Sequence, residues 1–369
     1  MLANCTDTTN TNITLTVREV APAVPVAAVA EEEDSVEVLE LSGATAVLPL
    51  KHQLGEYLAN RVDAGRLKAH VVGEFKGLQI AELPVRDTMY AGSTIRDTRL
   101  RQTTGLSVVG FWERGKLRPA YPDTAIQPDS LLVVAGTAPQ IGALNALLPQ
   151  RPDPSAPVLV IGAGKVGEAA VKALRRKGLR VHLIDRTEAV LAPLATSVDG
   201  VFTGDASDRR VLERAGILEA RSVLLTTHED AMNIYLAVYC RRLNARLRIV
   251  SRITHDRNLE AIHRAGADFV LSYTTLGIEA VMSLLRGYPP VLLGEGVELF
   301  SVPVPAALAG RMLKDSGIGS GTGLSVVALQ ANGEWIVPLT SETRLPPGAE
   351  LLMLGSHEQR AAFDQAFRG

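Results

Sequence analysis

The clearest pattern along the chain is a short apolar run, residues 158–161, that leads into a cluster of glycines. The run is too short for a helix and lacks the alternation of a half-buried strand, so it predicts a strand buried on both faces. Apolar residues then recur at helical spacing as far as Gly178, and a second strand is predicted at residues 181–184. Further apolar runs up to residue 271 bring the total to about six strands, which favours an α/β fold with a Rossmann-like, doubly wound parallel sheet.

The pattern before and after this core is weaker. Residues 1–34 are polar, then broken by prolines, and end in the acidic run Glu31-Glu32-Glu33-Asp34. We expect this segment to be a disordered lead-in and the acidic run to be a solvated patch and not a metal site. The remaining pattern predicts helices at residues 36–41, 54–62 and 357–367, a strand at 46–48, and short strands with turns at 70–135 and 297–354.

The chain also repeats itself. The repeat predicts a tandem duplication whose first copy lacks its front half, and only the second copy contains the glycine cluster. The matching segments are residues 39–48 with 262–271, residues 91–136 with 309–355 and, within the latter, the identical hexapeptide TGLSVV at 104–109 and 322–327.

The glycine cluster fits the dinucleotide-binding pattern G-x-G-x-x-G. Gly162 permits a tight turn, Gly164 lets the backbone approach a pyrophosphate, and Gly167 lets the helix pack close to the strand, while free amides at the helix start face the anion. Asp185 ends the second strand about 20 residues later, where a carboxylate accepts hydrogen bonds from an adenosine ribose. The guanidinium of Arg186 suits either a 2′-phosphate or stacking on adenine, but Asp185 would repel that phosphate. NAD(H), or an adenine nucleotide such as ATP or ADP, is therefore favoured over NADP, and a turn kept for packing alone is the alternative.

Two further charged residues follow predicted strands. Asp205 either accepts from an adenine amino group or a ribose, or caps the helix that begins near Ser207, for which Asp208 is the better candidate. Arg252 either clamps a phosphate or forms an interdomain ion pair. Because the carboxyl ends of parallel strands form the ligand rim of an open sheet, both residues are candidates for the site.

The loop after the fourth strand contributes Thr226, Thr227 and His228. These side chains would line the pocket opposite the glycines, and Asp230 would cap the next helix. No acid, base or nucleophile is paired with His228 in the sequence, so no catalytic residue is predicted.

Composition excludes several classes of protein. The 369 residues contain 38 Lys and Arg against 40 Asp and Glu, a formal charge of −2, which gives no basic field for nucleic acid. No apolar run reaches the length of a membrane helix, and the start of the sequence lacks the features of a secretory signal. The two cysteines match no disulfide or zinc framework, so we expect no metal site and a reducing cytosol.

Several motifs together carry a family resemblance: GAGKVG at residues 162–167, Asp185-Arg186, GDA at 204–206, HEDxxN at 228–233 and AGAD at 265–268. They resemble the nucleotide-binding lobe of RCK domains, the regulators of K⁺ conductance, also called the TrkA potassium-uptake regulatory family. The two TGLSVV segments resemble the small C-terminal lobe of the same family.

The resemblance implies a Rossmann-like TrkA-N (RCK-N) lobe with two small β-rich α+β TrkA-C (RCK-C) lobes. Tandem members usually carry a complete first lobe, often preceded by a two-helix pore. We therefore expect a first lobe truncated at its front, with the pore lost with it or carried by another polypeptide. The expected domains are a lead-in at 1–34, a remnant of a first RCK-N lobe at 35–70, a first TrkA-C lobe at 71–147, the NAD-binding TrkA-N lobe at 157–287 and a second TrkA-C lobe at 295–369.

The resemblance further implies a cytoplasmic, non-enzymatic sensor that forms a ring of RCK modules on the inner face of the cell membrane. There it would gate a K⁺ channel or uptake transporter according to the bound nucleotide. The alternatives are an NAD-dependent oxidoreductase and a nonfunctional shortened paralogue. The family's nucleotide contacts fall on Gly162, Gly164, Lys165, Val166, Asp185, Arg186, Asp205, Ala206, Thr226, Thr227 and Arg252.

Overall fold

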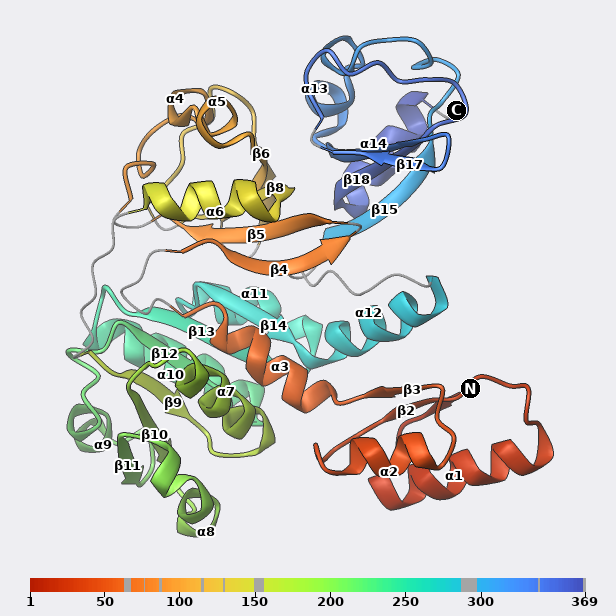
Figure 1. The fold of residues 1–369 in the computed structure, drawn as a ribbon. Coiled ribbons are helices and arrows are strands. Elements are labelled where there is room, and N and C mark those ends of the chain that lie inside the picture. Colours follow the sequence, from red (N-terminus) through yellow and green to blue (C-terminus); the bar gives the residue numbers. More distant parts are fainter. Residues whose placement is uncertain are drawn as a thin grey trace. The chain divides into compact units, whose positions relative to one another are not determined.

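Figure 1 shows the computed structural model, which describes residues 1–62, 68–75, 77–85, 88–113, 116–128, 130–148, 156–286, 297–337 and 339–367. The chain divides into two compact units. Met1–Gly65 and Pro152–Pro290 form one, here called the parallel unit, and Arg66–Arg151 and Val291–Gly369 form the other, the antiparallel unit. The expected domain boundaries at residues 287 and 295 lie outside the described residues.

A six-stranded parallel sheet forms the centre of the parallel unit. Its strand order is β11-β10-β9-β12-β13-β14, and every neighbouring pair is parallel. The central strands β9 and β12 are buried along their whole length, as their unbroken apolar sequence predicts. The expected doubly wound fold is confirmed. The strands are β9 (Val158–Ile161), β10 (Val181–Asp185), β11 (Gly200–Thr203), β12 (Ser222–Leu225), β13 (Arg248–Ile253) and β14 (Phe269–Ser272).

Helices connect these strands. The first, α7, begins directly after the glycines and buries its small apolar face, and Gly178 at φ +71° follows its end, as the sequence predicts. The helices are α7 (Lys165–Arg176), α8 (Glu188–Leu191), η1 (Ala192–Ser197), α9 (Arg209–Arg214), α10 (Asp230–Leu243), η2 (Asp256–Asn258), α11 (Leu259–Arg264) and α12 (Tyr273–Arg286).

The N-terminal segment is ordered, so the expectation of a disordered lead-in over residues 1–34 is wrong. A three-stranded parallel sheet, β1-β2-β3, has α1 and α2 on one side (Figure 1). Helix α3 continues from this sheet and packs against α7. The elements are β1 (Leu2–Ala3), α1 (Asp7–Val20), β2 (Ala27–Val29), α2 (Ser35–Leu41), β3 (Ala46–Leu48) and α3 (Leu50–Ala59).

Buried polar side chains explain why residues 1–34 are ordered and why the hydrophobic pattern did not predict it. In α1 the buried residues are Asn10, Thr14 and Val17, which lie at helical spacing but are mostly polar. The amide of Asn10 donates to the carbonyls of Cys5 (3.0 Å) and Val29 (2.8 Å), and so joins the two ends of this segment. A hydrophobic pattern cannot reveal a helix that is held by buried hydrogen bonds.

The same anchors occur in the six-stranded sheet. Asp7 accepts from the two backbone amides that follow Ala30, at 2.8 and 3.0 Å, and Asp230 accepts from the two that follow Ile253, at 2.7 and 3.0 Å. Asn233 donates to two backbone carbonyls in the way that Asn10 does. The small sheet β1-β2-β3 therefore repeats the arrangement of β12-β13-β14.

The antiparallel unit contains two related sheets. Their orders are β4-β5-β8-β6-β7 and β15-β18-β16-β17, and every neighbouring pair is antiparallel. The strands are β4 (His70–Phe75), β5 (Leu78–Pro84), β6 (Ser107–Glu113), β7 (Lys116–Pro119), β8 (Leu131–Thr137), β15 (Val297–Pro303), β16 (Ser325–Ala331), β17 (Glu334–Ile336) and β18 (Glu350–Ser356). The helices are α4 (Ile95–Thr98), α5 (Leu100–Thr104), α6 (Ala138–Leu147), η3 (Leu313–Asp315), α13 (Ile318–Thr322) and α14 (His357–Phe367).

The repeated hexapeptide has one structure in both sheets. Thr104 and Thr322 each donate to the carbonyl four residues earlier, both at 2.6 Å, and each precedes a glycine with positive φ. The strands that follow, β6 and β16, also meet, because the hydroxyl of Ser325 donates to the carbonyl of Val109 at 2.7 Å. The two copies thus contact one another within the antiparallel unit.

Within the described part of the chain, we find no helix with the length and apolar character that a bilayer span requires.

Candidate nucleotide-binding site

The glycine loop after β9 has the geometry that the motif predicts. Gly162 has φ +107°, and a side chain there would lie 2.9 Å from the amide nitrogen of Thr227. A side chain at Gly167 would collide with the carbonyl oxygen of Gly162, so this glycine allows α7 to approach the loop. At Gly164, in contrast, a side chain would meet nothing within 4 Å. The backbone of Gly164 therefore borders open space at the start of α7, where helix amides lack partners within the helix.

That space is a pocket of about 380 Å³ at the carboxyl ends of the strands. It includes every predicted site residue except Gly167, whose contact is with the loop itself. The lining residues are Lys51, Ile161, Gly162, Gly164, Lys165, Val166, Ile184, Asp185, Arg186, Thr187, Val190, Gly204, Asp205, Ala206, Thr226, Thr227, His228, Glu229, Met232, Leu236 and Arg252.

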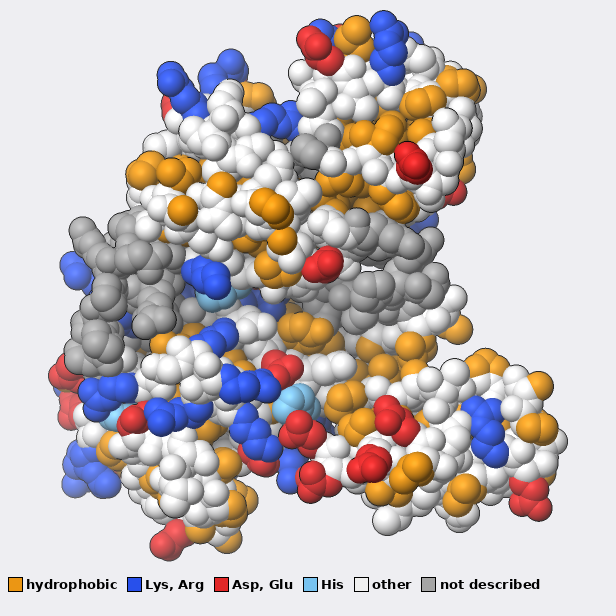
Figure 2. Space-filling view, viewed as in Figure 1, with side chains coloured by type: hydrophobic (Ala, Val, Ile, Leu, Met, Phe, Trp, Pro, Cys, Tyr) orange, Lys and Arg blue, Asp and Glu red, His pale blue; other side chains and the backbone are white. Residues whose placement is uncertain are grey.

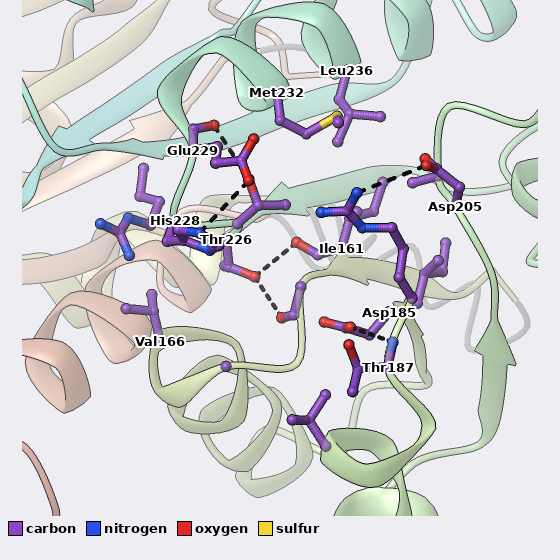
Figure 3. Close-up of a pocket in the computed structure, with 18 of the residues that line it drawn as sticks. Ile161, Val166, Asp185, Thr187, Asp205, Thr226, His228, Glu229, Met232 and Leu236 are labelled. Atoms are coloured by element: carbon purple, nitrogen blue, oxygen red, sulfur yellow. Dashed lines mark hydrogen bonds and ion pairs between the residues drawn. The ribbon is translucent and has the colours of Figure 1, made fainter.

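Asp185 at the end of β10 is held in a fixed position (Figure 3). Its Oδ2 accepts from the backbone amide of Ala163 at 2.7 Å, and its Oδ1 accepts from the amide of Thr187 at 2.9 Å. Each carboxylate oxygen can accept more than one hydrogen bond, so both can also receive a ligand hydroxyl. The carboxylate therefore orders the loop and remains available to a ribose.

Asp205 and Asp208 have separate positions: Asp208 caps α9, and a hydrogen bond from a ligand to Asp205 stays a prediction. Asp208 accepts from the amide of Arg210 at 2.9 Å and caps α9. Asp205 lines the pocket, accepts from the amide of Ser207 at 2.8 Å and lies 4.0 Å from Arg186. Hydrogen bonds from Ser207, and then the charge of Arg186, lower the pKa of Asp205, so it is a carboxylate at neutral pH.

The threonines after β12 support the loop. Thr226 is buried, and its hydroxyl lies 2.9 and 2.8 Å from the carbonyl oxygens of Ile161 and Gly162 (Figure 3). The hydroxyl of Thr227 lies 2.7 Å from the side-chain oxygen of Asn233. Sequence reasoning placed both threonines at the pocket but gave no sign that their hydroxyls are engaged within the protein.

Asp230 does not cap α10, so that prediction is wrong. Its carboxylate instead receives the backbone amides of Thr254 and His255 and the side chain of Asn258. Burial opposes ionisation of Asp230, but these three hydrogen bonds outweigh it and lower the pKa. The residue fixes the loop after β13, and thereby the position of Arg252.

Arg252 is a largely buried cation on the pocket wall. Its Nη2 donates to the hydroxyl of Thr254 at 2.8 Å, whereas the buried Nε has no hydrogen-bond partner among the described residues. Burial lowers the pKa of Arg252, and the nearby charge of Asp230 opposes that shift. Buried donors are normally satisfied, so an unpaired one beside a pocket fits an anionic or carbonyl group of a ligand. Among the described residues no carboxylate lies within ion-pair distance of Arg252, and its hydrogen bond to Thr254 stays within the same loop.

The histidines are peripheral. The side chain of His228 is 83% exposed and lies 3.7 Å from Glu229 at the pocket mouth. A ring nitrogen of His263 contacts the carbonyl of Ala267 at 3.1 Å, and burial lowers its pKa, as for a packing residue. In the described ranges no group of three His, Cys, Asp or Glu side chains is arranged to hold a metal ion.

The comparisons with known proteins agree with this geometry. The TrkA-N domain model matches residues 158–273, and the TrkA-C domain model matches residues 80–148 and 297–368. The crystal structure of the GsuK RCK domain is 38% identical and superposes with a TM-score of 0.68, covering 99% of this chain and 79% of that chain. The GsuK channel bound to NAD is 39% identical with a TM-score of 0.66, covering 99% of this chain and 66% of that one.

Curated relatives belong to K⁺ transport systems. The Trk system potassium uptake protein TrkA of Streptomyces coelicolor is 30% identical over 195 residues, 52% of this chain and 86% of that protein. Potassium channel protein 1 of Methanocaldococcus jannaschii is 24% identical over 211 residues, 54% of this chain and 63% of the channel. The chain thus spans less than two thirds of that channel.

The fold and the pocket define a Rossmann-type protein with a nucleotide-binding loop and paired β-rich lobes. The chain belongs to the RCK/TrkA family, with one TrkA-N and two TrkA-C regions in the order that the sequence predicts.

Proposed function

We propose that this chain is a nucleotide-sensing regulatory element of a K⁺ channel or K⁺ uptake system. The observation that carries the proposal is the pocket at the ends of β9, β10 and β12, where the glycine loop, the start of α7 and the carboxylate of Asp185 converge. Relatives named as a potassium channel protein and as Trk potassium uptake proteins support the physiological role.

NAD(H) is the favoured ligand, with ATP or ADP as the alternatives. The carboxylate of Asp185 suits the two hydroxyls of an unmodified ribose and would repel the 2′-phosphate of NADP. The related GsuK channel has been solved bound to NAD. The open space at Gly164 and the Nε of Arg252, which has no partner among the described residues, fit a ligand with phosphates.

Different groups of the predicted residues would contact different parts of the ligand. The amides at the start of α7 and the ammonium of Lys165 would receive the pyrophosphate, and Asp185 would receive the ribose. Gly162 and Gly167 give the loop its shape, and Thr226 supports it from below. Arg186, Asp205, Ala206 and Val166 would border the adenosine half, while Thr227, His228 and Arg252 lie on the opposite wall.

We infer that the site senses its ligand and does not transform it. Among the described residues that line the pocket, the one histidine, His228, is solvent-exposed beside Glu229, an arrangement unsuited to holding a proton in a dry site. An oxidoreductase would need such a group facing the nicotinamide. The relatives named as channel and uptake components agree with a regulatory role.

Regulation would follow from differential affinity. A nucleotide that binds one arrangement of the RCK modules more tightly than another shifts the equilibrium between them. The partner in this proposal is a membrane-embedded K⁺ pore, to which a ring of RCK modules is attached on the cytoplasmic face. The bound nucleotide would report the metabolic state of the cell to that pore.

Residues 1–59 complete the domain proposal. Their sheet repeats the contacts of β12-β13-β14, so we assign them to the second half of a first RCK-N lobe. This assignment extends to residue 1 the remnant that sequence reasoning had placed at residues 35–70. The TrkA-C regions then follow each nucleotide-binding region in turn.

The test is K⁺ flux through the pore-containing complex isolated with this chain and reconstituted in vesicles. Saturating NAD or NADH should change the flux of the wild-type complex, and Asp185→Ala should abolish the response. Asp123→Ala is the matched control, because Asp123 is an exposed carboxylate in the antiparallel unit. Flux that is insensitive to NAD, NADH, ADP and ATP, or steady conversion of the nucleotide, would contradict the proposal.

A further inference from the structure

Residues 1–59 are here called the first half-lobe. Its helix α3 packs closely against α7, the helix that follows the glycine loop. A side chain at Gly55 would collide with the carbonyl oxygen of Val166, in the first turn of α7, and with Ala169 beyond it. This close approach fixes α3 beside the nucleotide pocket, and Figure 1 shows the two helices side by side. Residues at the start of α3 are thereby brought to the pocket.

Lys51, in the first turn of α3, lines the pocket. Every other lining residue that the structure describes belongs to the six-stranded sheet or to its connecting loops and helices, between residues 161 and 252. Arg252 lines the same pocket, and both cations act on Tyr273: burial raises the pKa of Tyr273, and the charges of Lys51 and Arg252 both oppose the shift. The pocket is therefore lined by a cation from the first half-lobe as well as by its own guanidinium.

Two adjacent glutamates hold the lysines of the pocket. The carboxylate of Glu31 lies 2.7 Å from the ammonium of Lys51, and that of Glu32 lies 2.5 Å from the ammonium of Lys165. The hydrogen bond that Lys165 donates to Glu32 is the largest influence that raises the pKa of Lys165. Figure 2 shows acidic and basic side chains interleaved over the region of α3 and α7. Both lysines that border the phosphate space thus already carry a negative partner.

The two lysines can exchange their glutamate partners for another anion. The four side chains are between 34% and 49% exposed, and exposed ion pairs contribute little to stability. A pyrophosphate in the pocket offers the same lysines a negative partner and also receives the amides at the start of α7. Phosphate and carboxylate would compete for the same two ammonium groups.

We propose that Lys51 is a phosphate-binding residue of the nucleotide pocket, and that Glu31 and Glu32 are intramolecular competitors of the phosphates for Lys51 and Lys165. The proposal rests on the function proposed above and adds regulation to that site. Nucleotide binding would release the acidic loop, residues 31–33, from α7, and would in this way signal occupancy to the first half-lobe.

The first test is the affinity of the full chain for NAD and for ADP, measured by calorimetry. Lys51→Gln should weaken both about fivefold, the effect of one partly exposed ion pair. Lys172→Gln is the matched control, because Lys172 lies two turns after Lys165 in α7 and pairs with Glu33 and Glu168, but does not line the pocket. It should change the affinity less than twofold. Equal affinity of Lys51→Gln and wild type would overturn the role of Lys51.

The second test separates competition from simple repulsion. Glu32→Gln should tighten NAD binding about threefold by freeing Lys165. In a Lys165→Gln background the same substitution should have no effect, and a gain that persists there would overturn the competition. If wild type itself binds neither NAD nor ADP, the proposed function fails. If wild type binds while the variants behave like it, only this inference fails.

Discussion

The first half-lobe and the matching half of the second lobe share a scaffold and differ in what they offer a ligand. In both, an aspartate at the start of a helix receives two backbone amides from the loop after the next strand, and a buried asparagine joins two strand ends. The asparagine amide reaches the carbonyl of Val29 in one copy and that of Arg252 in the other. The buried Val29 of the first half-lobe therefore occupies the position that Arg252 has in the second lobe.

This difference separates residues that build the fold from residues that serve the site. The aspartate and asparagine anchors occur in both copies because they close the loops between parallel strands. In the half that the two copies share, Arg252 of the second copy lines the pocket, whereas its counterpart Val29 is a buried apolar residue. The first half-lobe contributes one lining residue to that pocket, Lys51 of α3.

The largest expected effect concerns the glycine loop. Gly167→Ala should lower the free energy of unfolding of the parallel unit by about 3 kcal/mol and abolish nucleotide binding, because the new Cβ meets the Gly162 carbonyl. Gly142→Ala, in α6 with open space around it, is the control and should be neutral or slightly stabilising. Thermal unfolding compares the two, and similar shifts for both would contradict the steric account.

The asparagine anchors test the shared scaffold. Asn10→Ala and Asn233→Ala should each cost about 2 kcal/mol of stability, since each leaves two backbone carbonyls without their donor. Only Asn233→Ala should also weaken NAD binding directly, because it holds Thr227 and Arg252. A comparable loss of affinity in Asn10→Ala would show that the two copies are less independent than their contacts indicate.

The aspartate anchors give a smaller, pH-dependent effect. In Asp7, as in Asp230, burial opposes ionisation but hydrogen bonds from backbone amides and side chains lower the pKa below its ordinary value of 3.8. A lowered pKa in the folded state stabilises the protein above the unfolded value, and the contribution is lost as the pH falls through the folded value. Asp7→Asn and Asp230→Asn should therefore be less stable than wild type at pH 7. The difference should shrink steadily in urea titrations below pH 3.8.

The sequence predicted those elements and site residues that depend on neighbouring positions along the chain. The strand at residues 158–161 and the helix at 357–367 have the predicted bounds, because each is a short apolar or periodic run between clear breaks. The glycine spacing located the pocket, since the motif and the next strand end lie within one βαβ unit. The repeated hexapeptide located the two β-rich lobes.

What escaped prediction depends on distant contacts. Residues 1–34 were expected to be disordered because the core of α1 is polar, although the Asp7 and Asn10 pair repeats that of Asp230 and Asn233 and was a usable signal. Asp230 was assigned to its own helix because its partners lie in the next loop. Lys51 gave no signal, since only the close packing of α3 on α7 brings it to the pocket.

The central claim is that the second lobe holds an adenine nucleotide on the backbone of its glycine loop. Calorimetric titration of NAD into wild type and into Gly164→Val tests it most directly, because Gly164 has an ordinary φ of −66° and open space beside it, so valine fits the fold and fills the phosphate space. We expect saturable binding at one site per chain for wild type, none for the variant, and the same thermal stability for both. Equal binding by the two proteins, or no binding by wild type, would contradict the account.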